Sequence, residues 1–245
     1  MASLTMWLVR PLHASPHLWF PGWRFDAQKG TSDSNVQRPE TTTVILDERF
    51  NQPAIDPRLR WLNPPPAWRV EPALPALVVQ PATPTDFWQQ THYGFRADNG
   101  HFLSIEVAGD FSITTKVRFH PVHQYDQAGL MIRVGPMCWI KASVEHEPQG
   151  PARLGAVVTN HGFSDWSVQD FPRETREVCL RIRKEDLDFI IEFASNENAG
   201  WNQMRIAHLN IESVAPPSCG LYACSPKGSG FRAEFEFMQI ARTSE

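Results

Sequence analysis

The stretch YDQAGLMIRVGPMCWIKASVEHE, residues 125–147, decides the fold because its side chains alternate in steps of two. Its aliphatic residues share one parity before the Gly-Pro pair and again after it: Ala128, Leu130, Ile132, Val134, Ile140, Ala142 and Val144. Successive side chains of a β-strand point to opposite faces of a sheet, so the pattern predicts two strands with one aliphatic face. Gly135-Pro136 between them predicts a turn that makes the strands neighbours.

The opposite parity of the same stretch has a different chemistry. It includes Gln127, Arg133, Trp139, Lys141 and Glu145, which a hairpin would bring together on one surface. That surface is either ordinary solvated sheet or the floor of a site. Leaving an indole ring in water costs roughly 25 cal/mol per Å² of apolar area, which favours the site.

The rest of the chain from Thr43 onward also favours strands. Turn signals divide it into roughly a dozen short strand candidates at the spacing typical of sandwiches and barrels. Proline-rich residues 62–88 exclude helices there, and Asp98-Asn99-Gly100 predicts a hairpin turn between strands at 91–97 and 101–107. No segment shows the 3.6-residue period of a helix. We therefore expect an all-β fold of two antiparallel sheets.

Composition bounds the function. The chain has 245 residues, of which 42% are hydrophobic and 20% charged, with a formal net charge of −4. A single β-domain with a tail fits this length. The sequence has no basic patch and no apolar run near the ~20 residues that span a bilayer, so we expect no nucleic-acid and no membrane partner. The four cysteines and nine histidines lack the spacing of a metal site, so we expect no metal and no cofactor.

Residues 1–44 differ from the rest and are interpreted as a poorly structured N-terminal extension and linker, which leaves 45–245 as the sandwich domain. The opening 25 residues contain Arg10 and Arg24 but no acid, a weak transit-peptide signature that prolines interrupt. No Asn-x-Ser/Thr acceptor occurs anywhere in the chain. We expect a cytoplasmic protein, with mitochondrial targeting by the N-terminal segment left open.

An ordered set of motifs carries a resemblance to a known family. The motifs are LNPP…W (62–68), DFW..T.YGF (86–95), DNGHFL (98–103), YDQAGLMIR (125–133), WIKASVE (139–145), VVTN.GFSDWS (157–167), LRI (180–182), GLYACSP (220–226) and GF…F (230–235). Over about residues 46–242, the chain resembles a widespread domain family of unknown function that includes the fungal "regulation of enolase" proteins. The resemblance implies a concanavalin A-like jelly roll with one concave sheet, a fold often called lectin-like. It implies no settled chemistry.

The predicted ligand-binding site lies on the concave face. Its residues are Asp86, Trp88, Tyr93, Tyr125, Gln127, Arg133, Trp139, Lys141, Glu145, Asp165, Trp166 and Arg181. Aromatic rings that stack on sugar C–H faces, interleaved with charged groups that bind hydroxyls, suit a polyhydroxylated ligand. Two alternatives stay open: the Trp rings could merely cover the sheet edge, and Lys141 and Glu145 could belong to structural ion pairs.

Three functions compete at this stage. The first is a lectin-like regulatory module that holds a carbohydrate or small metabolite, with a metabolic enzyme as a further candidate partner. The second is an enzyme, glycosidase-like or an isomerase or cyclase of specialised metabolism, with Glu145, Lys141 and Asp126 as candidate catalytic residues. The third is a protein–protein adaptor that uses the Trp-bearing N-terminal tail. Whether the chain is an enzyme is left undecided by the residues alone.

Overall fold

The computed structural model describes residues 42–211 and 215–243, and all of these form strands, turns and loops. Within those ranges no helix is long and apolar enough to cross a membrane. The predicted N-terminal extension falls almost entirely on residues 1–41, which lie outside the described residues, so that prediction stays untested. The first strand, β1 (Thr42–Glu48), includes the predicted boundary between residues 44 and 45.

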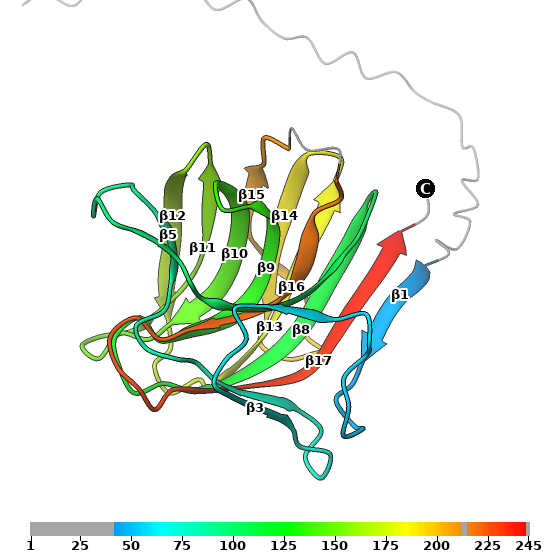
Figure 1. The fold of residues 1–245 in the computed structure, drawn as a ribbon, viewed down its shortest axis with the longest axis horizontal. Helices are drawn as coiled ribbons and strands as arrows, with labels where there is room; N and C mark the ends of the chain where they lie inside the picture. The colour runs from blue at the N-terminus through cyan, green and yellow to red at the C-terminus, as the bar shows by residue number, and fades with distance from the viewer. Residues whose placement is uncertain (1–41, 212–214, 244–245) are drawn as a thin grey trace, which may run out of the picture. The chain divides into compact units, whose positions relative to one another are not determined.

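Two antiparallel sheets form a jelly-roll sandwich (Figure 1), which confirms the predicted all-β class. The seven-stranded sheet has the order β12 (Phe163–Phe171), β11 (Ala152–Asn160), β10 (Cys138–Glu145), β9 (Gln127–Gly135), β16 (Ser218–Cys224), β7 (His101–Glu106) and β2 (Arg60–Leu62). The eight-stranded sheet has the order β15 (Asn202–His208), β14 (Asp188–Ala194), β13 (Glu177–Glu185), β8 (Phe111–His120), β17 (Arg232–Thr243), β4 (Leu77–Gln80) and β3 (Ala67–Val70), with β1 also paired to β17.

The alternating pattern of residues 125–147 is confirmed by the pairing of β9 with β10. Trp139 lies opposite Arg133, and Glu145 lies opposite Gln127. Leu130 and Ile140, of the other parity, are fully buried in the core between the two sheets. Alternation along β8 is equally regular, because every second side chain from Phe111 to Phe119 is buried. Burial of these aliphatic and aromatic rows is the main favourable term of the fold.

The pairing at residues 96–101 differs from the predicted hairpin. A third, two-stranded sheet is formed by β5 (Phe87–Gln89) and β6 (Arg96–Asp98), while β7 pairs with β16 and β2. The amides of Asn99 and Gly100 both donate to the carbonyl of Asp86, so this segment closes the small sheet instead of joining β6 to β7. A local turn signal cannot specify which distant strand becomes the partner.

Candidate functional site

The outer face of the seven-stranded sheet is covered by the β5–β6 hairpin, so it is not an open trough. Phe87 and Trp88 of β5 pack with Trp139, Tyr222 and neighbouring apolar groups in a second, small hydrophobic cluster outside the main core. The Phe87 ring lies 6.3 Å from that of Trp139 and 6.4 Å from that of Tyr222, in the tilted and edge-on geometries that aromatic pairs prefer. Strand β10 is therefore buried on both faces.

Polar contacts hold the hairpin on the sheet. Arg133 donates from both terminal nitrogens to the two carboxylate oxygens of Asp98, each at 2.8 Å, and its guanidinium lies 5.7 Å from the centre of the Phe87 ring. The backbone amide of Gln89 donates to the Ser164 hydroxyl of β12 at 2.9 Å. Bidentate charge-assisted pairs are among the stronger polar contacts in proteins, so the hairpin has a defined position.

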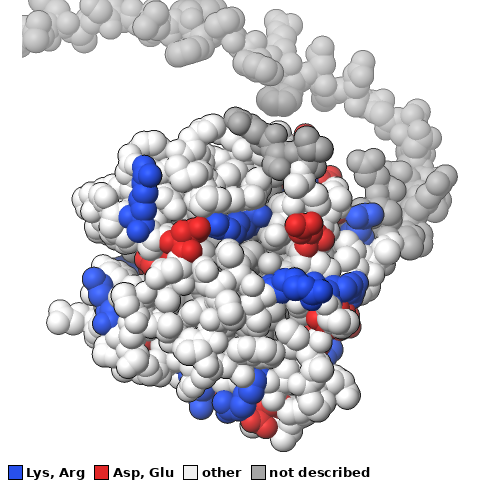
Figure 2. All heavy atoms as spheres, viewed as in Figure 1, with Lys and Arg blue, Asp and Glu red and all other residues white. Residues whose placement is uncertain are grey.

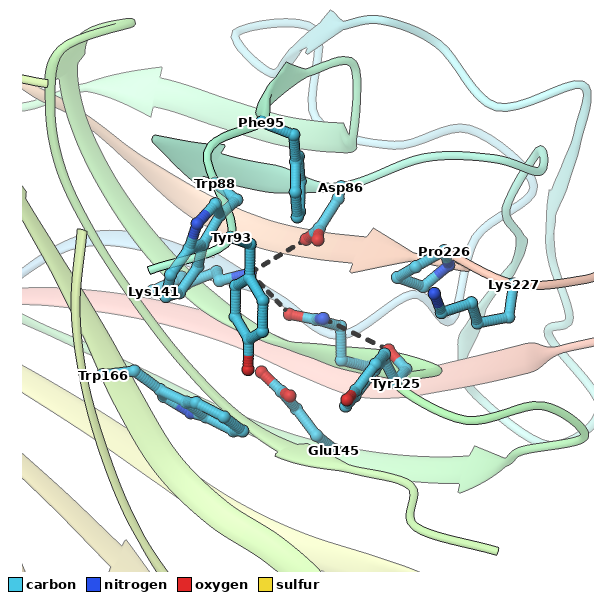
Figure 3. Close-up of a pocket in the computed structure, with 11 residues that line it drawn as sticks. Asp86, Trp88, Tyr93, Phe95, Tyr125, Lys141, Glu145, Trp166, Pro226 and Lys227 are labelled. Atoms are coloured by element: carbon cyan, nitrogen blue, oxygen red, sulfur yellow. Dashed lines mark hydrogen bonds and ion pairs between the residues drawn. The ribbon is translucent and has the colours of Figure 1, made fainter. Parts of the chain in front are cut away.

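A pocket of about 170 Å³ remains beside the covered area (Figure 3). It is lined by Asp86, Trp88, Tyr93, Phe95, Tyr125, Gln127, Lys141, Glu145, Trp166, Pro226 and Lys227. These residues come from β5 and the segment around it, from β9, β10 and β12, and from two loops. Aromatic rings form the walls, and charged and amide groups form the floor.

The floor is organised around Lys141, a lysine that is only 2% exposed. Its ammonium lies 3.1 Å from a carboxylate oxygen of Asp86 and 2.8 Å from Oε1 of Gln127. The Tyr222 hydroxyl donates to the same Gln127 oxygen at 3.0 Å. Burial lowers the pKa of Lys141, but Asp86 and Glu145 outweigh it and raise this pKa, so Lys141 stays charged. A buried charge with these partners is held in a defined position.

Glu145 is the titratable group of the floor. Burial raises the pKa of its carboxyl from 4.5 to about 7, and the nearby Lys141 ammonium only partly opposes this effect. In Figure 3 the carboxyl group points toward the Tyr93 hydroxyl, between Tyr125 and Trp166. A carboxyl with a pKa near neutrality can both give and accept a proton at physiological pH.

Aromatic rings that contact one another form part of the pocket wall. Trp88 and Tyr93 meet edge-on with ring centres 5.5 Å apart, and Tyr93 and Phe95 lie 6.1 Å apart. The Trp88 indole N–H donates to the carbonyl of Thr91 at 3.1 Å, and this hydrogen bond fixes the orientation of the ring. Tyr93 and Phe95 are exposed, which leaves their rings free to contact a ligand at the mouth.

Eight of the predicted ligand-binding residues lie together in this pocket: Asp86, Trp88, Tyr93, Tyr125, Gln127, Lys141, Glu145 and Trp166. The parity argument placed Gln127, Lys141 and Glu145 on one face, and the structure confirms that placement. Three lining residues were missed. Phe95 lies within the THYGF stretch, and Pro226 and Lys227 lie in a Gly- and Ser-rich loop whose sequence carries no binding signal.

Trp139 and Arg133 belong to the predicted set but line no part of the pocket. Trp139 is fully buried beneath Phe87, and its indole N–H donates to the carbonyl of Pro136 at 3.2 Å. Arg133 is occupied by Asp98. Both residues lie on the predicted face, but neither can line the pocket because the hairpin covers that part of the face.

Arg181 and Asp165 are placed away from the pocket. Arg181 belongs to β13 in the other sheet, where it bonds Glu192 at 2.7 Å and stacks 4.3 Å over the Trp201 ring. Asp165 lies opposite Val158, whose side chain faces the core. Because Asp165 belongs to the edge strand β12, its side chain can turn aside, and its carboxylate lies 3.0 Å from the Arg205 guanidinium. Arg181 points outward, but it does so from the other sheet, and alternation along a strand cannot specify the sheet.

Asp126, a candidate catalytic residue, has a structural role. Its carboxylate accepts hydrogen bonds from the amides of Val122 and His123, each at 2.8 Å, and from the Ser225 hydroxyl at 2.6 Å. With both oxygens used and only 2% of the residue exposed, Asp126 ties two loops together and does not reach the pocket.

Surface charge and the placement of metal-ligating side chains limit the kinds of ligand that the site can bind. On the face shown in Figure 2, acidic and basic side chains are interspersed and form no single-sign field. Among the residues that the structure describes, no group of three or more His, Cys, Asp and Glu side chains is placed to hold a metal ion. The chemistry of this pocket therefore has to be argued from its own carboxyls, amide, lysine and aromatic rings.

Comparisons with known proteins agree with this architecture. Residues 61–243 match the family described as protein of unknown function DUF1349. "Regulation of enolase protein 1" of Saccharomyces cerevisiae is 34% identical over 175 residues, which cover 71% of this chain and 85% of that protein. A crystal structure of a functionally unknown Saccharomyces cerevisiae protein has a TM-score of 0.69 at 31% identity, covering 77% of this chain and 97% of that one.

More distant structures share only the fold. A xylan beta-1,4-xylosidase from Bacillus halodurans has a TM-score of 0.64 at 14% identity, and the likeness covers 87% of this chain but 41% of the xylosidase. The assignment to a family rests on the family match over most of the chain and on the yeast relative. The chain belongs to the DUF1349 family and is a relative of the regulation-of-enolase protein of yeast.

Proposed function

We propose that this protein is a lectin-like regulatory module that holds one sugar ring, or a similarly small polyhydroxylated metabolite, in the pocket beneath the β5–β6 hairpin. The observation that carries the proposal is a small pocket in which aromatic walls surround a buried, charged floor. Its volume of about 170 Å³ lies below the range of sites for drug-sized molecules, which suits a single ring.

The chemistry of the pocket supports a hydroxyl-rich ligand. The rings of Tyr93, Phe95 and Trp166 offer surfaces for the C–H faces of a sugar ring. The carboxyl groups of Asp86 and Glu145 offer acceptors for ligand hydroxyls, and Lys141 stays charged beside them. The distant likeness to glycoside hydrolases adds only the fold to this argument.

A sugar and metabolite panel tests the binding proposal. A bound ligand should raise the melting temperature, because it stabilises the folded state in proportion to RT ln(1 + [L]/Kd). Trp166→Ala should abolish the response, whereas Trp201→Ala, which removes an indole from the other sheet, should keep it. Unchanged melting curves across the whole panel, or equal losses in the two variants, would contradict the proposal.

The regulatory part of the proposal comes from the name of the yeast relative. We infer a metabolic enzyme as the regulated partner and a cytoplasmic location, which the lack of an Asn-x-Ser/Thr acceptor supports. Purified enolase assayed with and without this protein provides the direct test. An effect on enolase that depends on the panel ligand supports regulation through the pocket, and no change in enolase activity or stability contradicts this partner.

A second candidate function, acid–base catalysis, is favoured by one specific observation. Glu145 has a pKa of about 7 within a pocket that also holds a charged lysine. Groups of this kind cluster at catalytic sites, although structural networks also produce them. Glu145→Gln separates the two functions: if turnover of a panel compound is lost while its affinity is kept, the protein is an enzyme. If only affinity changes, it is a binding module.

A further inference from the structure

A second hollow lies at one end of the eight-stranded sheet and shares no lining residue with the pocket. It has a volume of about 410 Å³ and is lined by Gln80, His120, Pro121, Val122, Arg176, Gly230 and Arg232. Three of these residues are basic, and none is acidic. Neither the proposed sugar site nor the family likeness accounts for this arrangement.

Strand register gathers the basic groups. His120, at the end of β8, lies directly opposite Arg232, the first residue of β17. Arg176 comes immediately before β13, and its carbonyl accepts the amide of Phe119 at 2.8 Å, which places it beside the end of β8. Cross-strand neighbours lie about 4.5–5.5 Å apart, so His120 and Arg232 lie side by side at the sheet end, and Arg176 lines the same hollow from the loop before β13.

Carboxylates near these basic side chains are too few to balance their charge. Glu234 lies 3.1 Å from Arg232 and 3.3 Å from His120, but it is also shared with Arg118 at 3.3 Å. Arg176 has no ion pair with any residue in the described part of the chain.

Two further carboxylates nearby are already engaged. Glu177 and Glu236 both contact Lys116 and Arg118. Burial first, and then Arg232 and Arg118, lower the pKa of the His120 imidazole against the effect of Glu234, so the positive charge of the lining comes from Arg176 and Arg232. The hollow is therefore a concave surface with excess positive charge.

We propose that this hollow binds the phosphate group of a small phosphorylated metabolite. Guanidinium groups present planar forks of N–H donors that match the oxygens of a phosphate, and Arg232 of β17 and Arg176 of the loop before β13 both line the hollow. Gly230, with φ of 106°, lines the hollow without a side chain, so a ligand can approach its backbone closely. The volume leaves room for the rest of a small molecule.

Titration calorimetry with inorganic phosphate and glycerol phosphate, against sodium chloride of equal ionic strength and glycerol, tests the site. We expect saturable binding of both phosphates. Arg176→Gln and Arg232→Gln should each weaken it at least tenfold. Arg173→Gln, three residues away in the same loop, removes the same charge from an exposed arginine outside the hollow and should leave the affinity within twofold.

Three results would overturn the proposal. Phosphate could act no differently from chloride, or all three arginine variants could lose affinity equally, as a diffuse electrostatic effect predicts. A phosphoserine peptide that binds tighter than glycerol phosphate, through the same two arginines, would identify a protein partner instead of a metabolite. The variants alter exposed or half-buried side chains, and circular dichroism of each confirms that loss of binding is not loss of fold.

Discussion

Glu145→Gln should make the protein more stable above neutral pH, although it removes a charged group from the candidate site. Glutamine has nearly the shape of a protonated glutamic acid, so the change isolates the charge. Burial raises the pKa of Glu145 to about 7 from an ordinary 4.5. Between these two values the folded protein holds a proton that the unfolded chain has released, so the stability falls as the pH rises.

The magnitude follows from the same two values. Each pKa unit corresponds to about 1.36 kcal/mol, so the difference between about 7 and 4.5 amounts to roughly 3 kcal/mol of unfolding free energy. The stabilising effect of the protonated carboxyl is complete below pH 4.5 and lost above pH 7. The Lys141 ammonium already opposes the shift and is included in it. Glutamine carries no charge at either pH, so the variant does not incur this loss.

Urea unfolding at pH 5 and pH 8.5 measures the effect. We expect the variant and the natural protein to differ little at pH 5, and the variant to be more stable by roughly 3 kcal/mol at pH 8.5. Glu106→Gln is the matched control, because Glu106 is exposed at the end of β7. A difference between Glu145→Gln and the natural protein that is the same at both pH values would refute the burial argument.

Three further substitutions test the structure around the pocket. Lys141→Met should destabilise the protein by about 3–5 kcal/mol, as measured by urea unfolding, because it leaves the Asp86 carboxylate without its buried partner; a loss below about 1 kcal/mol would show that the pair is hydrated. Arg133→Ala should free the β5–β6 hairpin from Asp98, with faster amide exchange confined to residues 87–98, and uniform exchange across the sandwich would contradict this. Gly129→Ala should cost about 1–3 kcal/mol or more, since its Cβ would lie 2.0 Å from the Ala142 carbonyl oxygen. Gly135→Ala on the same strand meets no atom within 4 Å and should be neutral in thermal unfolding.

Much of the fold could be predicted from the sequence because it depends on a local property. Alternation in residues 125–147 follows from the two-residue repeat of an extended backbone, and it correctly assigned Leu130 and Ile140 to the core and Lys141 to the opposite face. The turn at Gly135-Pro136 made the strands neighbours for an equally local reason. Seventeen strands occur in the described residues where roughly a dozen were expected, because the proline-rich stretch forms several strands of three or four residues.

Alternation could not predict which segment covers the outward face, nor to which sheet a strand belongs. The hairpin of β5 and β6 covers Trp139, although it lies much earlier in the chain, before β7 and β8. Arg181 has the expected outward parity but belongs to the other sheet. Parity specifies a face without specifying which sheet carries it or what lies over it.

The sequence by itself therefore determined which side chains of 125–147 are buried between sheets and which point outward. Only the tertiary structure decided that the outward face would be half covered, that Glu145 would titrate near neutrality beside Lys141, and that Lys227 and Phe95 would complete the pocket. The physical reason is range. Alternation is set by the dihedral angles of adjacent residues, whereas burial, and with it the pKa of a carboxyl, is set by contacts between segments far apart in the chain.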